Sequence, residues 1–398
     1  MRILIVEDDA ISRKLLQRRL EKWDHEVTAA PDGLVAWQEF QKGNYPIVIS
    51  DWMMPGMDGL ELTRRIRGLQ NTGYTYIILL TAKLAKADLI QGMDAGADDF
   101  ITKPFDPDEF RVRLRAGERI VELEKDLELR NIALEEANLR MHRDLDAAAK
   151  IQKSLLPAIP PEANGVRSAW YFQPCDQLAG DIFNVFKLDE DHLGIYVIDV
   201  SGHGVAASLW SVMLSRMLSP NFQQSGLLLK KDHKTGDLQI VPPAAVAGKL
   251  NRLFPVNPET GQFFTMLYGV LNLKNLEFRY VSAGQPDLLY LPFRREPKII
   301  EFPSFPIGFN EEPGYEEKVI GLQGGDRIIL YSDGVVEARR RGGEMYGKDR
   351  LIQALHHKKD QQLSSTLHGI MDDLSVWCGK KQYEDDITMV ALEVKADA

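Results

Sequence analysis

The 398-residue chain lacks the features that mark secreted, zinc-binding and membrane proteins. It has two cysteines, Cys175 and Cys378, in no C-x-x-C or other metal-ligand spacing, so we expect inert thiols and neither a disulfide framework nor a zinc site. No run approaches the ~20 apolar residues that span a bilayer. The N-terminus enters the strand-like segment Ile3–Val6 without a signal-peptide pattern. We therefore expect a cytoplasmic protein without a membrane partner.

Negative charge outweighs positive charge in this chain. The chain has 48 Lys and Arg against 58 Asp and Glu, which gives a formal net charge of -10. Nucleic acids are bound through basic surfaces that replace counterions on the phosphates. The composition therefore disfavours a nucleic-acid partner and, with it, an output domain that reads DNA.

The composition is otherwise that of an ordinary soluble protein, with 44% apolar and 27% charged residues. A chain of this length exceeds one hydrophobic core, so we expect two domains and a connector.

Short apolar runs alternate with amphipathic stretches of helical length up to about residue 119. The runs, each read as a strand, are Ile3–Val6, Glu26–Ala29, Ile47–Ser50, Ile77–Leu80 and Asp99–Thr102. Strands buried on both faces have this continuous apolar character, so the pattern predicts a five-stranded parallel, doubly wound α/β sheet. Its site is expected at the carboxyl ends of the strands.

Residues 120–156 have the pattern of a long helix with a heptad repeat. The seven-residue series of apolar side chains is Ile120, Leu127, Leu134, Met141, Ala148 and Leu155. The second series is interrupted by polar residues and consists of Leu123, Arg130, Ala137, Asp144 and Ile151. Two interpretations stay open, a single solvated helix with i,i+4 charge pairs and a two-stranded coiled coil. We favour the coiled coil, and hence a homodimer, with the helix ending before Pro157.

The pattern changes again from about residue 168. The strands expected there include 194–200, 266–273, 278–282, 327–331 and 388–394, and the helices lie near 205–218, 243–254 and 362–378. This predicts an α+β domain with antiparallel sheets flanked by helices. Residues 221–241 are rich in turn formers and are expected to form an exposed insertion.

Polar side chains stand at four strand ends of the N-terminal domain. Glu7 and Asp8 follow the first strand, Asp51 ends the third, Thr81 ends the fourth and Lys103 follows the fifth. Carboxylates gathered at one sheet edge can hold a hard cation such as Mg2+, and an aspartate can accept a phosphoryl group covalently. The acid that follows Asp8 is left out of the metal set, because the spacing after Val6 favours the two acids before it.

At these motifs residues 1–119 resemble the bacterial response-regulator receiver family, which implies a sensor histidine kinase as phosphodonor. The resemblance implies that Asp51 is the phosphoacceptor and that Thr81 and Lys103 contact the phosphoryl oxygens. It also implies a bound Mg2+, which would be held by Glu7, Asp8, Asp51 and the Met53 carbonyl. Phe100 stands at the position of the aromatic switch residue.

Four separated acidic motifs occur in the C-terminal half. They are Leu178-Ala179-Gly180-Asp181, Asp199-Val200-Ser201-Gly202-His203-Gly204, Ser332-Asp333-Gly334 and Glu384-Asp385-Asp386. Aspartates that converge from several strands repel one another unless cations lie between them. The pattern therefore predicts a site for two Mg2+ or Mn2+ ions ~3.5 to 4 Å apart that activates water for attack on a phosphate ester.

These motifs resemble the metal-dependent protein phosphatase two C family, also called PPM, in its bacterial sporulation and stress-response branch, over about residues 145–398. Further matching motifs are Ile151-Gln152, Leu155-Leu156-Pro157, Leu250-Asn251, Phe264-Thr265-Met266, Ser282-Ala283-Gly284 and Pro306-Ile307-Gly308. The resemblance implies a two-sheet sandwich with helices outside, and as substrate a phosphoserine or phosphothreonine on an anti-sigma-factor antagonist.

The same resemblance assigns the metal ligands. Asp199 would bridge both ions, the Val200 carbonyl would join one, and Asp333 and Asp385 would hold the other. Asp181 would support the cluster directly or through water.

The sequence departs from the family pattern at three positions near the site. Ala179 replaces a glycine, Asn184 replaces a second acid, and Gln285 stands where relatives have histidine. His203 is expected either to donate to the phosphate or leaving group or to hold its loop.

An active phosphatase is favoured because all four principal acids are present, and a non-catalytic adaptor with a degenerate site is the alternative. A nucleotide cyclase is excluded because the run at Asp181 lacks the required Glu-Phe.

The sequence thus predicts a multidomain protein with an α/β receiver at 1–119, a coiled-coil helical linker at 120–156 and an α+β phosphatase domain at 157–398. Phosphorylation of Asp51 is expected to change the arrangement of the linker helix and thereby the phosphatase site. The sequence leaves the sign of that control open.

Overall fold

The computed structural model describes residues 1–69, 73–82, 86–161, 163, 165–220, 226–231, 237–255, 261–379 and 383–396. The chain forms two compact units, Met1–Arg140 and Met141–Ala398. Among the described residues, no helix combines the length and the apolar character that a bilayer span requires.

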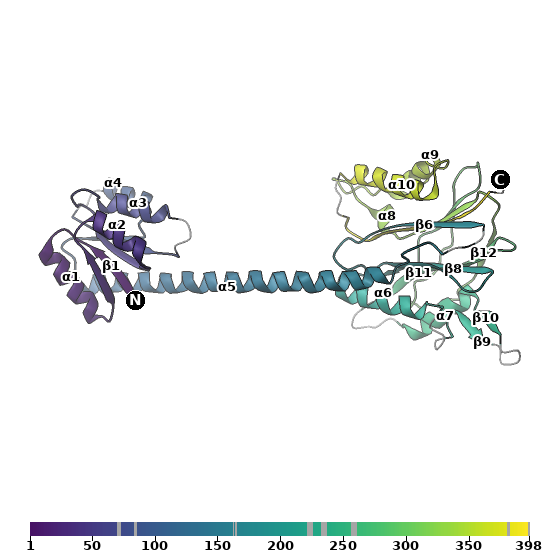
Figure 1. Cartoon of the computed structure of the whole chain (residues 1–398), viewed down its shortest axis with the longest axis horizontal. Coiled ribbons are helices and arrows are strands. Elements are labelled where there is room, and N and C mark those ends of the chain that lie inside the picture. The colour runs from purple at the N-terminus through teal and green to yellow at the C-terminus, as the bar shows by residue number, and fades with distance from the viewer. Residues whose placement is uncertain are drawn as a thin grey trace. The chain divides into compact units, whose positions relative to one another are not determined.

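The first unit is built on a parallel sheet in the order β2-β1-β3-β4-β5. The strands are β1 Arg2–Val6, β2 Glu26–Ala30, β3 Ile47–Asp51, β4 Tyr76–Thr81 and β5 Asp99–Thr102. They are connected by the helices α1 Ala10–Lys22, α2 Gly33–Lys42, α3 Gly59–Arg67 and α4 Lys86–Asp94. The predicted doubly wound sheet is confirmed, and Figure 1 shows the helices against its faces.

The alternation of side chains along β1 explains why both faces of this sheet are covered. Ile3 and Ile5 belong to an apolar cluster with α1 and the start of α5, whereas Leu4 and Val6 belong to a second cluster with α2 and α3. Successive strand residues point to opposite faces, so a run of four apolar residues supplies both clusters.

Helix α5, Pro107–Ser154, is a continuous helix of 48 residues. Its first turns belong to the receiver core, where Phe110 and Leu114 are buried. Further along, the heptad residues Leu127 and Leu134 are 53% and 60% exposed. The helix itself is thus present, while the coiled coil and the domain limits at 119 and 156 stay predictions.

The second unit is a sandwich of two antiparallel five-stranded sheets, as predicted. The first sheet has the order β15-β12-β11-β8-β7, with β7 Ile182–Lys187, β8 His192–Val200, β11 Phe264–Asn272, β12 Glu277–Ala283 and β15 Lys318–Gly321. The second has the order β14-β13-β16-β17-β6, with β6 Val166–Gln173, β13 Leu288–Leu291, β14 Lys298–Ile300, β16 Arg327–Tyr331 and β17 Ile387–Val394.

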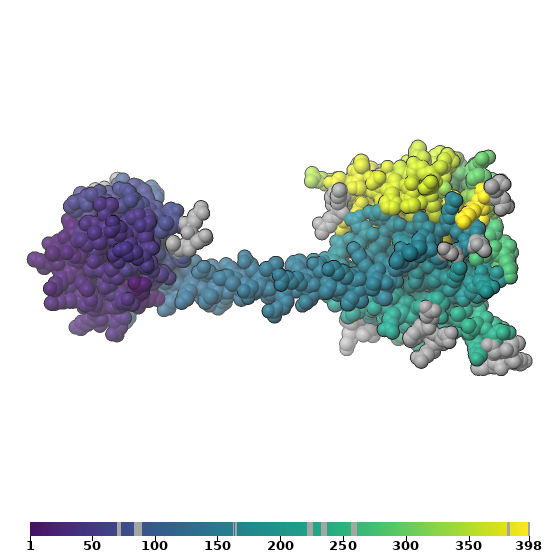
Figure 2. Space-filling view, in the orientation of Figure 1, coloured from purple at the N-terminus to yellow at the C-terminus, as the bar shows by residue number. Residues whose placement is uncertain are grey.

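Helices cover both outer faces of the sandwich (Figure 1). The first sheet is covered by α6 Val205–Met217 and α7 Pro243–Leu253, and the second by α9 Gly347–His357 and α10 Leu363–Cys378, with the short α8 Gly334–Glu337 beside them. In Figure 2 the yellow surface of α10 and the teal to green surface of α6 and α7 accordingly lie on opposite sides of this unit. A third apolar cluster fills the space between the sheets. The unit therefore has four layers.

The segment predicted to be an exposed insertion is anchored at its ends. Leu227, Leu228 and Val241 are buried in the cluster beneath α6 and α7, and the small hairpin of β9 Leu229–Lys231 and β10 Leu238–Ile240 lies between them. The prediction of exposure is wrong for these apolar residues, because turn-forming composition conceals the few leucines that reach the core. Residues 221–225 and 232–236 lie outside the described residues.

Candidate phosphotransfer and metal sites

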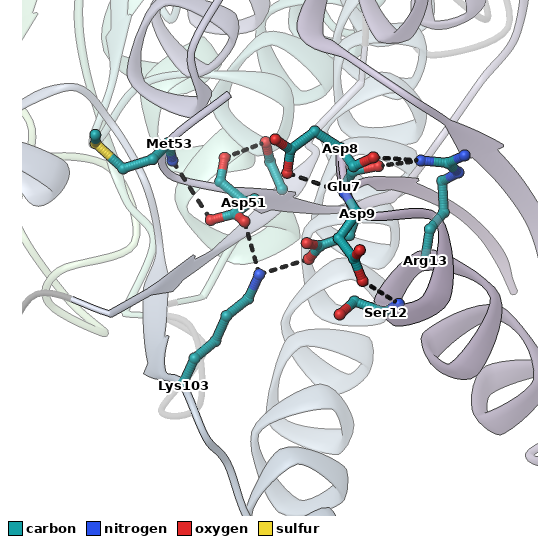
Figure 3. Close-up of polar contacts among 9 residues, drawn as sticks. Glu7, Asp8, Asp9, Ser12, Arg13, Asp51, Met53 and Lys103 are labelled. Carbon is teal, nitrogen blue, oxygen red and sulfur yellow. Dashed lines mark hydrogen bonds and ion pairs between the residues drawn. The ribbon is translucent and has the colours of Figure 1, made fainter. Parts of the chain in front are cut away.

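The receiver site lies where the predicted strand ends meet (Figure 3). The Lys103 ammonium lies 2.6 Å from a carboxylate oxygen of Glu7 and 2.6 Å from one of Asp51. Ligand atoms of Glu7, Asp8 and Asp51 lie within 4.8 Å of one another. Three carboxylates against one ammonium leave an excess of negative charge, which fits a divalent cation with oxygen ligands.

Partial burial and the ion pairs at this edge shift the pKa values of Glu7 and Lys103. Desolvation raises the pKa of Glu7, although Lys103 opposes the shift. Burial alone would lower the pKa of Lys103, but the hydrogen bonds to Asp51 and Glu7 outweigh it and raise that pKa. The lysine therefore stays charged and ties the two carboxylates together.

The other receiver residues lie around this pair. The Met53 N–H points toward Asp51, at 3.4 Å from its carboxylate, and Thr81 is buried at the end of β4. Phe100 packs partly buried against the cluster that contains Trp52. The Lys103–Pro104 peptide is cis, the form usual in the resembled family. Asp9, which the sequence left out of the metal set, accepts a hydrogen bond from the Ser12 N–H at 2.7 Å and caps α1.

In the second unit the acidic motifs meet at one edge of the sandwich. Asp199 is the penultimate residue of β8, and Asp181 precedes its antiparallel neighbour β7. Asp333 follows β16, and Asp385 precedes the neighbouring β17. The end of one antiparallel strand lies beside the start of the next, so each sheet contributes two acids to the same edge.

No three of the described residues Asp181, Asp199, Asp333 and Asp385 have ligand atoms within 4.8 Å of one another, but their charges act on one another. Burial, with the charges of Asp199 and Asp386, raises the pKa of Asp181 well above its ordinary value. Burial, with Asp333 and Asp385, does the same for Asp199. Burial and the neighbouring Asp385 raise the pKa of Asp333 to about 6. Without added positive charge the cluster is short of counterions, so these residues fit a divalent metal site.

Access to the cluster is graded. Asp181 is buried and accepts a hydrogen bond from the Thr388 hydroxyl, Asp199 and Asp333 are partly exposed, and Asp385 is exposed. Asp181 thus stands at the closed end of the site. That position favours support of the cluster over direct contact with a phosphate.

Asp386 is the acid whose role the sequence analysis missed. The residue is 3% exposed, and its carboxylate accepts hydrogen bonds from the backbone N–H groups of Cys175, Gly180 and Asp181 at 2.8, 2.7 and 3.1 Å. Asp386 therefore fixes the segment that carries Asp181. Two adjacent acids before a strand carry no signal of which one faces the other acids and which one binds the neighbouring loop.

Gly334 permits the close approach of the two loops from the second sheet. A Cβ atom at this position would lie 2.2 Å from the Asp386 carbonyl oxygen and 3.3 Å from the Asp385 Cβ. Backbone at that distance leaves no room for a side chain. The glycine after Asp333 is thus required for the two acidic motifs to meet.

A second group of ligand atoms within 4.8 Å in the described part of the chain consists of Cys175, Asp385 and Asp386. Burial and the charge of Asp386 raise the pKa of the Cys175 thiol to about 12. A protonated thiol is a poor ligand for Mg2+ or Mn2+, and Asp386 is occupied by N–H groups. The carboxylates are therefore better suited than Cys175 to hold a divalent metal ion.

The last turn of α5 reaches the site through Gln152, which is 5% exposed. Its side-chain NH2 donates to the Ala179 carbonyl at 2.7 Å and to the Ser211 hydroxyl at 2.9 Å, and its carbonyl accepts from the Ala179 N–H at 3.1 Å. Ala179 lies two residues before Asp181, and Ser211 is on α6, which follows the loop after Asp199. One side chain thus connects the linker helix to two site segments.

The residues that depart from the family pattern have defined places. Gln285 is buried, accepts from the Thr265 hydroxyl and donates to the Tyr331 carbonyl at 3.2 Å, so it joins β11 to β16 beneath the site. Asn184 lies on β7 and accepts from the Val185 N–H at 2.8 Å. His203 is exposed and lies near enough to Asp385 to interact with it electrostatically, which leaves both of its predicted roles open.

Metal binding at the C-terminal cluster is expected to weaken at acid pH. Carboxylates must lose their protons to ligate, so below the pKa of about 6 at Asp333 each competing proton weakens binding by about tenfold per pH unit. Calorimetry with Mn2+ at pH 7.5 and 5.5, in two buffers of different ionisation enthalpy, should show weaker binding at pH 5.5 and proton release at both. The measurement uses the double variant Asp8→Asn, Asp51→Asn, in which the candidate metal site of the receiver is removed. Equal affinity at both pH values would contradict the expectation.

Comparison with known proteins agrees with the geometry of both units. The family model described as Stage II sporulation protein E (SpoIIE) matches residues 189–395, and the response regulator receiver domain model matches residues 3–115. The chain is 26% identical over 255 residues to Phosphoserine phosphatase RsbU of Bacillus subtilis, covering 63% of this chain and 70% of RsbU. Its N-terminal part is 43% identical over 119 residues to Transcriptional regulatory protein TcrA of Mycobacterium tuberculosis, covering 30% of this chain and 46% of TcrA, less than half of that relative.

A solved structure shares the fold of the second unit. The SiaA-PP2C domain of Pseudomonas aeruginosa superposes with a TM-score of 0.53 at 20% identity, and the match covers 65% of this chain and 98% of that domain. Together these findings define a receiver domain joined to a phosphatase domain of the protein phosphatase two C type. The chain belongs to the SpoIIE family, with a response-regulator receiver at its N-terminal end.

Proposed function

We propose that the chain is a cytoplasmic, metal-dependent protein phosphatase that removes phosphate from phosphoserine or phosphothreonine. The observation that carries this proposal is the placement of Asp181, Asp199, Asp333 and Asp385 at the ends of neighbouring strands on one edge of the sandwich, where burial and nearby carboxylates raise the pKa values of the first three. The resemblance to a phosphoserine phosphatase supports the same chemistry.

The proposed roles follow from position. Asp199, the Val200 carbonyl, Asp333 and Asp385 would hold two Mg2+ or Mn2+ ions, which when bound supply a water of lowered pKa and offset phosphate charge. Asp181, at the closed end of the site, would support the other three acids directly or through water. The exposed His203 near Asp385 is placed either to protonate the leaving oxygen or to hold its loop. No side chain is required as a nucleophile.

The proposed substrate is a phosphorylated regulatory protein, and an anti-sigma-factor antagonist is the example that the family resemblance suggests. The proposed phosphodonor of the receiver is a sensor histidine kinase that acts on Asp51, with Mg2+ at Glu7 and Asp8. The excess negative charge at the Lys103-linked carboxylates supports that part of the proposal.

A non-catalytic adaptor is the competing function, and one assay separates the two. The full chain is incubated with p-nitrophenyl phosphate and Mn2+, with and without beryllofluoride as the phosphoryl mimic on the receiver. The proposal requires Mn2+-dependent turnover by the wild type and its loss in Asp199→Ala and Asp333→Ala. Beryllofluoride should raise or lower the turnover of the wild type. Absence of turnover under every condition would support the adaptor.

Gln152 is expected to transmit the state of the linker helix to the phosphatase site. In Gln152→Ala the Ala179 N–H and C=O and the Ser211 hydroxyl lose their shared partner. We expect the effect of beryllofluoride on turnover to fall by at least half, because the coupling passes through these bonds. Lys153→Ala, at the exposed next residue, is the matched control. A full beryllofluoride response in Gln152→Ala would remove this residue from the coupling.

The exposed heptad residues support a homodimer through α5. Leu127→Glu with Leu134→Glu places like charges at two proposed core positions, so we expect the mass measured by light scattering to fall from dimer to monomer. Ile132→Glu, which is 49% exposed and outside both heptad series, is the control and should stay dimeric. A wild-type monomer, or an unchanged dimer in the double variant, would contradict the proposed seam.

A further inference from the structure

Three phenylalanines form an aromatic platform beside the loop that follows Asp199. The rings of Phe305 and Phe309 are stacked with centroids 6.4 Å apart, and Phe263 meets Phe309 edge-on at 6.0 Å. Phe305 is 48% exposed and Phe309 59%. Large aromatic side chains exposed side by side are informative, because such side chains dominate the energetics of protein interfaces.

The platform is joined directly to the candidate metal site. The Ser201 N–H donates to the Phe263 carbonyl at 3.0 Å, and the Phe263 N–H donates to the Ser201 hydroxyl at 3.0 Å. In the pairing of β11 with β8, Thr265 lies opposite Asp199. Phe263 is therefore two residues, or roughly 7 Å of strand, from the position opposite the proposed bridging aspartate.

The platform is also held in place. Asn251, which is 5% exposed, accepts from the Gly308 N–H at 2.8 Å and donates to the Asn310 carbonyl at 2.8 Å. The Ile307 N–H donates to the Phe264 carbonyl at 2.9 Å. The backbone of the loop that carries Phe305 and Phe309 is thus hydrogen-bonded on both sides, which lowers the cost of ordering it at binding.

We propose that this aromatic platform binds an apolar side chain next to the phosphorylated residue of the protein substrate. The inference rests on the proposed phosphatase function and adds to it a sequence preference. The occupant follows from continuity, because a phosphoserine bound at the metal ions that Asp199 would hold places its neighbouring residues near Phe263, which is hydrogen-bonded to Ser201 in the loop after Asp199. The exposed Glu311 and Glu312, which follow the platform, disfavour an acidic flank and an anionic membrane surface.

Two phosphopeptides and one small ester test the proposal with the full chain and Mn2+. The peptides carry one phosphoserine flanked on both sides by Leu-Gly-Leu or by Ser-Gly-Ser, and the ester is p-nitrophenyl phosphate. We expect the wild type to favour the leucine peptide by about tenfold or more in kcat/KM, the range of discrimination that an apolar subsite supplies. Phe305→Ala and Phe309→Ala should reduce this preference to near unity, with kcat/KM for the ester unchanged.

Phe293→Ala is the matched control, because Phe293 is a similarly exposed phenylalanine at 47% on the β13–β14 connection. It should retain the wild-type preference. The inference is overturned if the wild type turns over both peptides equally, or if the platform variants keep the preference or change only the oligomeric state. A wild type that hydrolyses neither the ester nor a peptide would instead overturn the phosphatase function and this inference with it.

Discussion

Asp199→Asn is expected to lower Mn2+-dependent hydrolysis of p-nitrophenyl phosphate by about 10³-fold, the scale of loss when a central charge-stabilising group is removed. The substitution keeps the side-chain shape but removes the charge that lies among Asp333, Asp385 and Asp386. Steady-state kinetics at saturating Mn2+ measure the effect.

The same variant should be more stable than the wild type when metal is absent. A carboxyl whose folded pKa is raised opposes folding at every pH above its unfolded pKa, so at neutral pH the metal-free wild type bears a cost that asparagine removes. Thermal unfolding in EDTA should show a higher Tm for Asp199→Asn. Asp360→Asn, at an exposed acid, is the control and should change neither property. An active or a less stable Asp199→Asn would contradict a metal-ligand role.

Asp386→Ala is expected to have the opposite effect on stability. Three backbone N–H groups lose their buried carboxylate acceptor, and the free energy of unfolding should fall by roughly 3 to 5 kcal/mol. Urea unfolding followed in EDTA measures the loss. Activity should fall as well, because the segment that carries Asp181 is no longer fixed.

The Mn2+ dependence of this variant distinguishes a positioning residue from a ligand. Raised Mn2+ should not restore Asp386→Ala, since no metal contact has been removed. Normal stability combined with recovery of activity at high Mn2+ would show that Asp386 is itself a metal ligand.

The receiver could be predicted from sequence almost completely because of where its residues lie. Parallel strands covered on both faces, such as Ile3–Val6, are apolar at every position and are easily recognised. Their polar site residues must then follow at the carboxyl ends, as Asp51 and Lys103 do. Both the fold and the candidate site of this unit are therefore encoded in short local segments.

The phosphatase unit is harder to predict from sequence, because its site depends on contacts between segments that are far apart in the chain. Asp385 and Asp386 are adjacent and chemically identical, and only the sandwich decides that one stays exposed while the other accepts backbone N–H groups. Gln152 was visible as a family motif, but its contact with Ala179 spans 27 residues. No local pattern marks such contacts.

The start of the linker helix shows a similar limit of pattern recognition. The heptad series was read from Ile120, yet the helix begins at Pro107 as part of the receiver, and Ile120 still packs partly buried against the receiver core. Phe110 and Leu114 are buried by the sheet and Leu127 is exposed, although all three are apolar residues of one continuous helix. Periodicity identifies a helical face but not what covers it.

Anomalous diffraction from crystals of the full chain grown with MnCl2 is the most direct measurement of the metal site. We predict two manganese peaks ~3.5 to 4 Å apart, enclosed by Asp199, Asp333 and Asp385. Manganese only at Glu7, Asp8 and Asp51, with no peak among the C-terminal acids, would contradict a metal-dependent phosphatase.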